Sequence, residues 1–89
     1  ALLWPSLQTI AAPVSSASRV ERAVIEDVIL KLCTGRFLTL KELAALLNRS
    51  ADKLRIRYLT DLVRSHALEL RYPNAPNHPA QAYRTRDNA

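Results

Sequence analysis

The sequence predicts an α+β domain of the winged helix-turn-helix class, with three helices and a small antiparallel β-hairpin as the wing. Two short amphipathic segments, residues 40–47 and 51–65, are separated by a polar turn, Asn48-Arg49-Ser50. The second segment carries apolar residues on one side and basic residues on the other. Strict alternation over residues 68–72 predicts a strand, and residues 81–85 are suited to a return strand.

Residues 1–17 are expected to form a linker or an arm from an upstream domain. They contain no charged side chain, and Pro5 and Pro13 interrupt their apolar residues. A short helix starting at Pro5 is compatible with this segment, because proline suits the first helical turn. The winged-helix domain is then expected over residues 18–86, followed by a frayed tail over residues 87–89.

The first helix of the domain is expected over about residues 19–34. Ser18 and Glu21 have the spacing of a capping box, in which each side chain bonds the backbone amide of the other residue. Apolar residues then recur every fourth position as far as Leu32. Gly35, the only glycine of the chain, is placed to end the helix in a left-handed conformation. A short extended segment follows over residues 36–38.

A second capping box, Thr39 and Glu42, predicts the start of the helix over residues 40–47. Asn48 tolerates the left-handed conformation that a tight turn needs. Ser50 has the side chain and position to cap the third helix. These local signals make the pair of helices the most informative part of the sequence.

The third helix, over residues 51–65, is expected to be the recognition helix that enters the major groove of DNA. At about 100° per residue, its apolar side chains share one broad arc. Arg55 falls inside this arc, and we expect it either to extend out to water or to pair with a carboxylate such as Glu42. The opposite side carries a polar stripe of Lys53, Arg57, Thr60 and Arg64.

The candidate DNA contacts lie on this helix and on the wing strands. Arg57 is the best single candidate, since a forked guanidinium can pair bidentately with guanine. Arg49 and Ser50, at the amino terminus of the helix, are placed to hold a phosphate with the free backbone amides. The alternative is a solvated basic face on a helix that packs for stability alone. The full set of predicted contacts is Arg49, Ser50, Lys53, Arg57, Thr60, Arg64, Arg71 and Arg84.

The net charge of +5 is not spread evenly along the chain. The positive excess begins at residue 35, where the two-helix motif begins, and a local basic bias favours an anionic partner. A solvated surface with an ordinary excess of lysine and arginine is the alternative. The expected wing tip differs from this pattern, because Asn74, Asn77 and His78 stand there without lysine or arginine.

Catalytic, metal and membrane functions find no support in the sequence of this fragment. Cys33 is the only cysteine and lies in an apolar run, which predicts a buried thiol in a reducing cytoplasm. His66 and His78 lack metal-ligand spacing, and a single glycine cannot form a phosphate-binding loop. No apolar window approaches the roughly 18–20 residues of a membrane span. We therefore expect no enzymatic reaction, metal, cofactor or membrane contact here.

Several segments resemble the C-terminal winged-helix domain of bacterial proteins described as RecG-related ATP-dependent DNA helicases or as transcriptional regulators. The match spans about residues 19–86, and its most specific strings are Pro76-Asn77-His78-Pro79 and Gln81-Ala82-Tyr83-Arg84. In that family an AlbA/Schlafen-type, divergent AAA nucleotide-binding region precedes the tail, and similar tails occur on some Fic-family proteins. The resemblance implies a parent that binds ATP with Mg²⁺, and DNA. The nucleotide-binding residues would then lie upstream of Ala1.

Two functions follow as hypotheses. The first is a non-catalytic domain of a cytoplasmic protein that binds duplex DNA with the helix over residues 51–65 in the major groove. The second is a protein-interaction, dimerisation or autoregulatory module, which docks on the upstream ATPase domain of the same chain or forms a homodimer. The second rests on the wing tip without basic residues, on Trp4 and on the apolar amino-terminal arm.

Overall fold

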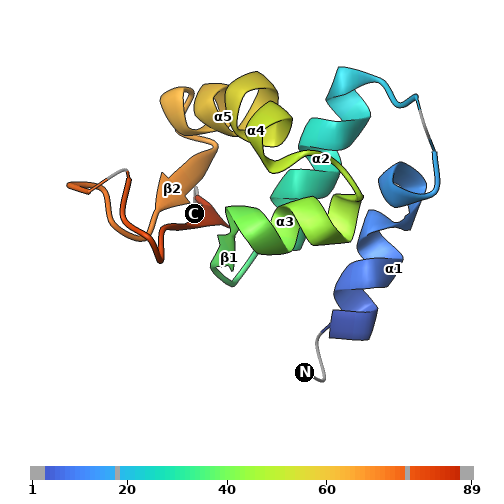
Figure 1. Cartoon of the computed structure of the whole chain (residues 1–89), viewed down its shortest axis with the longest axis horizontal. Helices are drawn as coiled ribbons and strands as arrows, with labels where there is room; N and C mark the ends of the chain where they lie inside the picture. Colours follow the sequence, from blue (N-terminus) through green and yellow to red (C-terminus); the bar gives the residue numbers. More distant parts are fainter. Residues whose placement is uncertain (1–3, 18, 76, 87–89) are drawn as a thin grey trace.

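Four helices and a three-stranded antiparallel sheet make up the described part of the chain, residues 4–17, 19–75 and 77–86 of a computed structural model (Figure 1). The α+β class is therefore confirmed, although one helix more is present than was predicted. The helices are α1 (Trp4–Ser15), α2 (Arg22–Leu32), α3 (Leu40–Leu47), and a continuous helix that consists of α4 (Ala51–Leu54), η1 (Arg55–Leu59) and α5 (Thr60–Arg64). We call the last one the 51–64 helix. The strands are β1 (Leu38–Thr39), β2 (Leu68–Leu70) and β3 (Ala82–Thr85).

Helix α1 is the additional helix, and it occupies most of the segment that was expected to be a linker or arm. Leu7, Ala11 and Val14 are spaced by four and three residues, so they share one face and are all buried. This face packs against α2 and α3. Pro13 does not end the helix, which continues to Ser15. The described part of the arm is thus joined to the core that the later helices form.

Helix α2 is shorter than expected. It begins at Arg22, and Glu21 is its N-cap, with an extended backbone and no capping bond from its side chain. Ser18, the other member of the predicted capping box, lies outside the described residues, as does the predicted tail over residues 87–89. The helix ends at Leu32, and Gly35 has the left-handed φ of 72° that was predicted for it.

Helix α3 and the turn after it agree with the sequence prediction. The Thr39 hydroxyl accepts a hydrogen bond from the Glu42 amide at 3.1 Å, and the Glu42 carboxylate accepts one from the Thr39 amide at 2.9 Å. The predicted capping box is therefore confirmed. Asn48 ends the helix in the left-handed region, with φ 54°. Ser50 occupies the N-cap position of the 51–64 helix, but its side chain makes no capping hydrogen bond.

The 51–64 helix contains a π-helical segment, η1, where the backbone bonds run from residue i+5 to residue i. The Thr60 amide donates to the Arg55 carbonyl, and the Thr60 hydroxyl donates to the same carbonyl at 2.8 Å. Leu54 and Leu59, five residues apart, are both buried. The wider turn keeps these two leucines in the core and changes which polar residues share a face.

The sheet has the strand order β1-β3-β2, with every pair antiparallel. Tyr83 lies opposite Leu38 on one side and opposite Leu70 on the other, so these three residues share one face of the sheet. Tyr83 and Leu38 are buried, which makes this the inner face. Glu69 pairs with Arg84 one step along the strands, and both therefore belong to the opposite face of the sheet.

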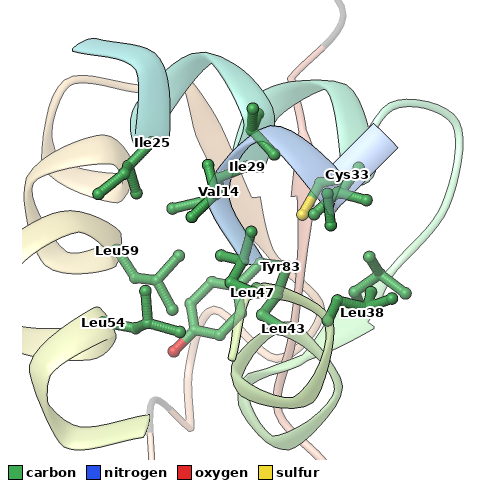
Figure 2. Packing of buried hydrophobic residues seen from close by; sticks show 14 of the residues in the cluster. Val14, Ile25, Ile29, Cys33, Leu38, Leu43, Leu47, Leu54, Leu59 and Tyr83 are labelled. Carbon is green, nitrogen blue, oxygen red and sulfur yellow. The ribbon is translucent and has the colours of Figure 1, made fainter. Parts of the chain in front are cut away.

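The core lies between the helices and the inner face of the sheet. Figure 2 shows side chains from α1, α2, α3, the 51–64 helix and β3 meeting there. One side of the 51–64 helix enters this core, and its other side is left at the surface of the domain. The largest fully buried side chains are those of Val14, Ile29, Leu32, Cys33, Leu43, Leu47, Leu54, Leu59 and Leu68.

Candidate nucleic-acid interface

The outward side of the 51–64 helix is the candidate interface, because it gathers more exposed charged side chains than any other element. In Figure 1, α4 and α5 lie along the upper edge of the molecule, with β2 and the loop that follows it to one side. We call this side the outer face. Its exposed residues are Asp52, Lys53, Arg55, Ile56, Arg57, Thr60, Asp61 and Arg64.

One group of predicted contacts surrounds a groove between the start of α2 and the start of the 51–64 helix. The groove has a volume of about 590 Å³, and we call it the α2-side groove. Arg19 adds a positive charge that the sequence did not single out, and Glu21 contributes a negative one. The predicted contacts that line the groove are Arg49, Ser50, Lys53 and Arg57.

Arg49 is engaged in holding the fold together. One guanidinium nitrogen donates to the carbonyls of Val14 at 3.1 Å and Ala17 at 2.6 Å, near the carboxyl end of α1. The other donates to the carbonyls of Leu47 and Asn48. Val14 and Leu47 lie in the last turns of α1 and α3, where carbonyls lack amide partners within the helix, and Ala17 and Asn48 follow those helices. The predicted phosphate contact at Arg49 therefore competes with a structural role that ties α1 to the turn.

Thr60 lies at the edge of the outer face toward the sheet, whereas Lys53 and Arg57 lie at the edge toward α2. It lines a pocket of about 210 Å³ between the 51–64 helix and the sheet, together with Arg55, Leu70 and Tyr83. The structure thus divides the predicted stripe. A uniform turn of about 100° per residue places Thr60 beside Arg57, but the wider π-helical turn places it beside Arg55.

Arg55 faces the sheet and the loop that joins β2 to β3. It also lines a groove of about 560 Å³ with Lys41 and His78. It does not pair with Glu42, whose carboxylate bonds the Thr39 amide. Its nearest acidic partner is Asp52, at 3.9 Å, and 52% of its side chain is exposed. Arg55 therefore extends into solvent, which is the first of the two expected arrangements, and the carboxylate nearest to it is that of Asp52 and not that of Glu42.

Arg71 and Arg84 lie away from the 51–64 helix. The guanidinium groups of both stand over the ring of Phe37, at 5.9 Å for Arg71 and 4.5 Å for Arg84. Arg84 also donates to the Glu69 carboxylate at 2.6 Å. Because Tyr83 points into the core, its neighbour Arg84 points away from the core, on the opposite face of the sheet. The structure therefore does not bring these two arginines together with the candidate interface.

The loop between β2 and β3 has a defined internal structure on both sides of Pro76. The rings of Tyr72 and His78 are stacked, with 4.0 Å between their centroids. His78 Nδ1 accepts a hydrogen bond from the Ala80 amide at 2.9 Å. The imidazole thus stabilises the loop itself.

Arg64 and Ile56 complete the outer face. Arg64 is exposed in the last turn of α5. Ile56, which the sequence did not single out, is 65% exposed. The sequence pattern could have predicted this exposure, because at uniform helical spacing Ile56 falls outside the apolar arc, while Arg55 falls inside it. Two such misplaced residues side by side indicate a change in the helical turn.

Burial rather than catalysis explains the raised pKa values of Cys33 and Tyr83. Desolvation raises the pKa of the Cys33 thiol to about 12. Burial also raises the pKa of the Tyr83 hydroxyl, and the positive charge of Arg55 opposes this shift. Neither group is ionised at neutral pH, so neither has the form that a nucleophile or general base requires.

Other kinds of site are not found in the described ranges. No three His, Cys, Asp or Glu side chains among the described residues come together as metal ligands. Of the helices described, none has the length and apolar character that crossing a bilayer requires. Comparison with models of known families, with curated proteins and with solved structures finds no match for this chain.

Proposed function

We propose that this chain is a non-catalytic winged helix-turn-helix domain that binds duplex DNA with the 51–64 helix in the major groove. The observation that carries the proposal is the outer face, where Lys53, Arg55 and Arg57 are exposed within little more than one helical turn. An α-helix fits the major groove, which is about 12 Å wide, and arginine and lysine bind its guanine edges and the flanking phosphates.

The connection between α3 and the 51–64 helix supports this proposal. A capped helix, a left-handed residue at Asn48 and a second helix starting at Ala51 form the sequence of elements that a helix-turn-helix needs. In such motifs the second helix is the one that enters the groove. The β2–β3 hairpin follows it directly, and in a winged helix this is the position of the wing.

The charge balance of the outer face also favours a polyanion. Asp61, one of its two acidic residues, accepts a hydrogen bond from Arg22 of α2 at 2.6 Å. That pairing offsets the negative charge of Asp61, while Lys53, Arg57 and Arg64 face solvent. A face with this excess of positive charge gains free energy on DNA through the release of condensed counterions.

The wider context of the domain remains part of the proposal. Placement at the carboxyl terminus of a bacterial ATP-dependent helicase-related or regulatory protein rests only on the resemblance of residues 36–44, 58–63, 68–73 and 76–84. ATP and Mg²⁺ would belong to the upstream region of that parent.

A protein-interaction or dimerisation module is the second candidate, and Ile56 is the observation that favours it, because 65% of this apolar residue is exposed. The amino-terminal arm contributes less than the sequence suggested. Leu7, Ala11 and Val14 are buried in the core of the domain itself, so they are not available to a partner.

Binding of labelled duplexes of random sequence, measured by fluorescence anisotropy in a salt series, tests the proposal. With about four to six phosphates engaged, the logarithm of the affinity should fall with the logarithm of the salt concentration, at a slope of about −4 to −5. Arg57→Gln should weaken binding several-fold without unfolding the domain.

Arg71→Gln is the matched control, since it removes the same charge from the face of the sheet that lies opposite the core, away from the 51–64 helix. It should weaken binding less than Arg57→Gln does. A folded domain that shows no salt-dependent binding to any duplex contradicts the proposal. Concentration-dependent sedimentation in the absence of DNA, if abolished by Ile56→Ala, would favour the second candidate instead.

A further inference from the structure

Ile56 lies in the middle of the outer face, with positively charged side chains on both sides of it. Arg55 lines the pockets toward the sheet, and Arg57 lines the α2-side groove. Lys53 precedes Ile56 by three residues and is exposed beside it, whereas Thr60 lies with Arg55 on the side toward the sheet. The only other large hydrophobic side chain exposed in the described ranges is that of Val24, at 39% against 65% for Ile56.

The π-helical segment brings this arrangement about. Leu54 and Leu59 both enter the core, and the wider turn between them carries Arg55, Ile56 and Arg57 outward as a group. Arg22 of α2 donates to the Arg57 carbonyl at 2.6 Å, and the Thr60 hydroxyl donates to the Arg55 carbonyl. Side-chain donors thus hold the backbone on either side of Ile56.

We infer that Ile56 reads thymine in the major groove, by packing against the C5-methyl group of a base under the middle of the helix. The inference rests on the proposed function and specifies the chemistry that the outer face recognises. Among the groups at the floor of the major groove, the thymine methyl is the apolar one, and apolar side chains recognise it by contact. Arg55 and Arg57 then hold the phosphates or guanine edges on either side of that contact.

DNA fits this surface better than a protein partner does. A stable protein interface buries about 1,200–2,000 Å² and has a core from which charged residues are depleted. Here one isoleucine stands among Lys53, Arg55 and Arg57, which a protein partner would have to desolvate. A polyanion with an apolar group at the floor of its groove complements both the charges and the isoleucine.

The test begins with selection of the duplexes that the wild-type domain binds best from a random pool. Each thymine of a selected site is then replaced in turn by deoxyuridine, which removes the C5-methyl group and leaves the base-pairing edge unchanged. We expect about a fourfold loss of affinity at one or two positions, the amount that a single buried methyl group contributes. Ile56→Ala should bind the thymine and uracil forms of those positions equally.

Val24→Ala is the matched control, because it truncates the other exposed apolar side chain on a different helix. This variant should keep the wild-type loss at the uracil positions. Since Ile56 is exposed, Ile56→Ala should unfold at the wild-type temperature, which separates a recognition defect from a folding defect.

The possible failures can be told apart. If duplexes bind with the expected salt dependence, but uracil is tolerated equally by the wild type and by Ile56→Ala, the inference about Ile56 is wrong and the proposed function stands. If no duplex binds, the proposed function fails and the inference fails with it. If Ile56→Ala instead converts a dimer to a monomer, Ile56 is a protein contact and not a reader of thymine.

Discussion

The side chain of Gln81 pairs with both backbone groups of Tyr72. Its carbonyl oxygen accepts from the Tyr72 amide at 3.0 Å, and its amide nitrogen donates to the Tyr72 carbonyl at 2.9 Å. The same nitrogen donates to Ala75 at 3.1 Å, and the same oxygen accepts from the Ala82 amide at 3.1 Å. The side-chain amide thus acts as an additional peptide group, which extends the β2–β3 pairing into the loop.

Replacement of Gln81 should destabilise the domain, because this side chain is only 9% exposed and its backbone partners would lose their hydrogen bonds. We expect Gln81→Ala to lower the free energy of unfolding by about 1–3 kcal/mol, measured by urea denaturation. Gln81→Glu keeps the acceptor and loses the donor, so at neutral pH it too should be less stable than the wild type. Acidification that protonates the new carboxyl restores a donor and should recover part of the loss. Equal stability of Gln81→Ala and the wild type would contradict this account.

Arg49 should matter for folding more than for DNA binding. Its guanidinium serves the carbonyls of Val14, Ala17, Leu47 and Asn48, and the side chain is half-buried. Arg49→Ala should lower the free energy of unfolding by about 1–3 kcal/mol. Arg49→Lys should recover only part of this loss of stability, because the ammonium group of lysine cannot reproduce the forked donors of the guanidinium.

The exposed Lys53 offers the comparison for this prediction. Lys53→Ala should change the free energy of unfolding by no more than about 0.5 kcal/mol and should weaken duplex binding. The opposite result, an Arg49→Ala variant of wild-type stability that no longer binds DNA, would restore Arg49 to the phosphate-binding role that its position at a helix amino terminus suggested.

Local signals in the sequence were sufficient for the segment from Thr39 to Asn48. A capping box and a residue suited to the left-handed region act over three or four residues, so tertiary packing is not needed to recognise them. The alternation over residues 68–72 likewise predicts β2, although the strand ends at Leu70. One further backbone bond joins the Arg71 amide to the Ala82 carbonyl, and at Tyr72 the Gln81 side chain replaces the strand partner. These hydrogen bonds from a side chain, in place of a neighbouring strand, depend on the folded loop.

The features that were missed depend on tertiary packing. Residues 1–17 lack charge and contain two prolines, which suits a linker, but burial of one face of α1 against α2 and α3 overrides this. The basic residues of the 51–64 helix were found from the sequence, whereas their distribution was not, because a uniform period was assumed although Arg55 and Ile56 both depart from it. The outward direction of Arg84 does follow from the inward direction of Tyr83, and strand alternation alone predicts it.

The two N-cap residues of the helix pair should differ in their contributions to stability. Thr39 makes a reciprocal capping box with Glu42, whereas the Ser50 side chain makes no capping bond. Thr39→Ala should lower the free energy of unfolding by about 1 kcal/mol. Ser50→Ala should leave it within about 0.5 kcal/mol of the wild type. Urea denaturation of both variants measures this difference, and equal losses would show that the capping box contributes nothing beyond the N-cap position.

Alkaline pH should destabilise the domain through Cys33. Burial raises the pKa of this thiol from 9.0 to about 12, so in the unfolded chain it ionises at lower pH than in the folded chain. Between these values unfolding releases a proton, and the free energy of unfolding should fall as pH rises, by up to about 1.4 kcal/mol per pH unit. Below pH 9 the contribution of Cys33 is fully present and constant.

Cys33→Ala separates this effect from other alkaline titrations. The variant should be less stable at neutral pH, because it leaves a cavity in the core, but its stability should decline less steeply between pH 9 and 10. That range lies below the ordinary pKa of 10.0 for tyrosine, above which the buried Tyr83 adds its own loss. Urea denaturation of the wild type and the variant at closely spaced pH values measures the two slopes. Parallel slopes would show that the Cys33 thiol ionises in the folded protein as readily as in the unfolded chain, and rapid reaction of the folded domain with a thiol reagent at pH 8 would then be expected.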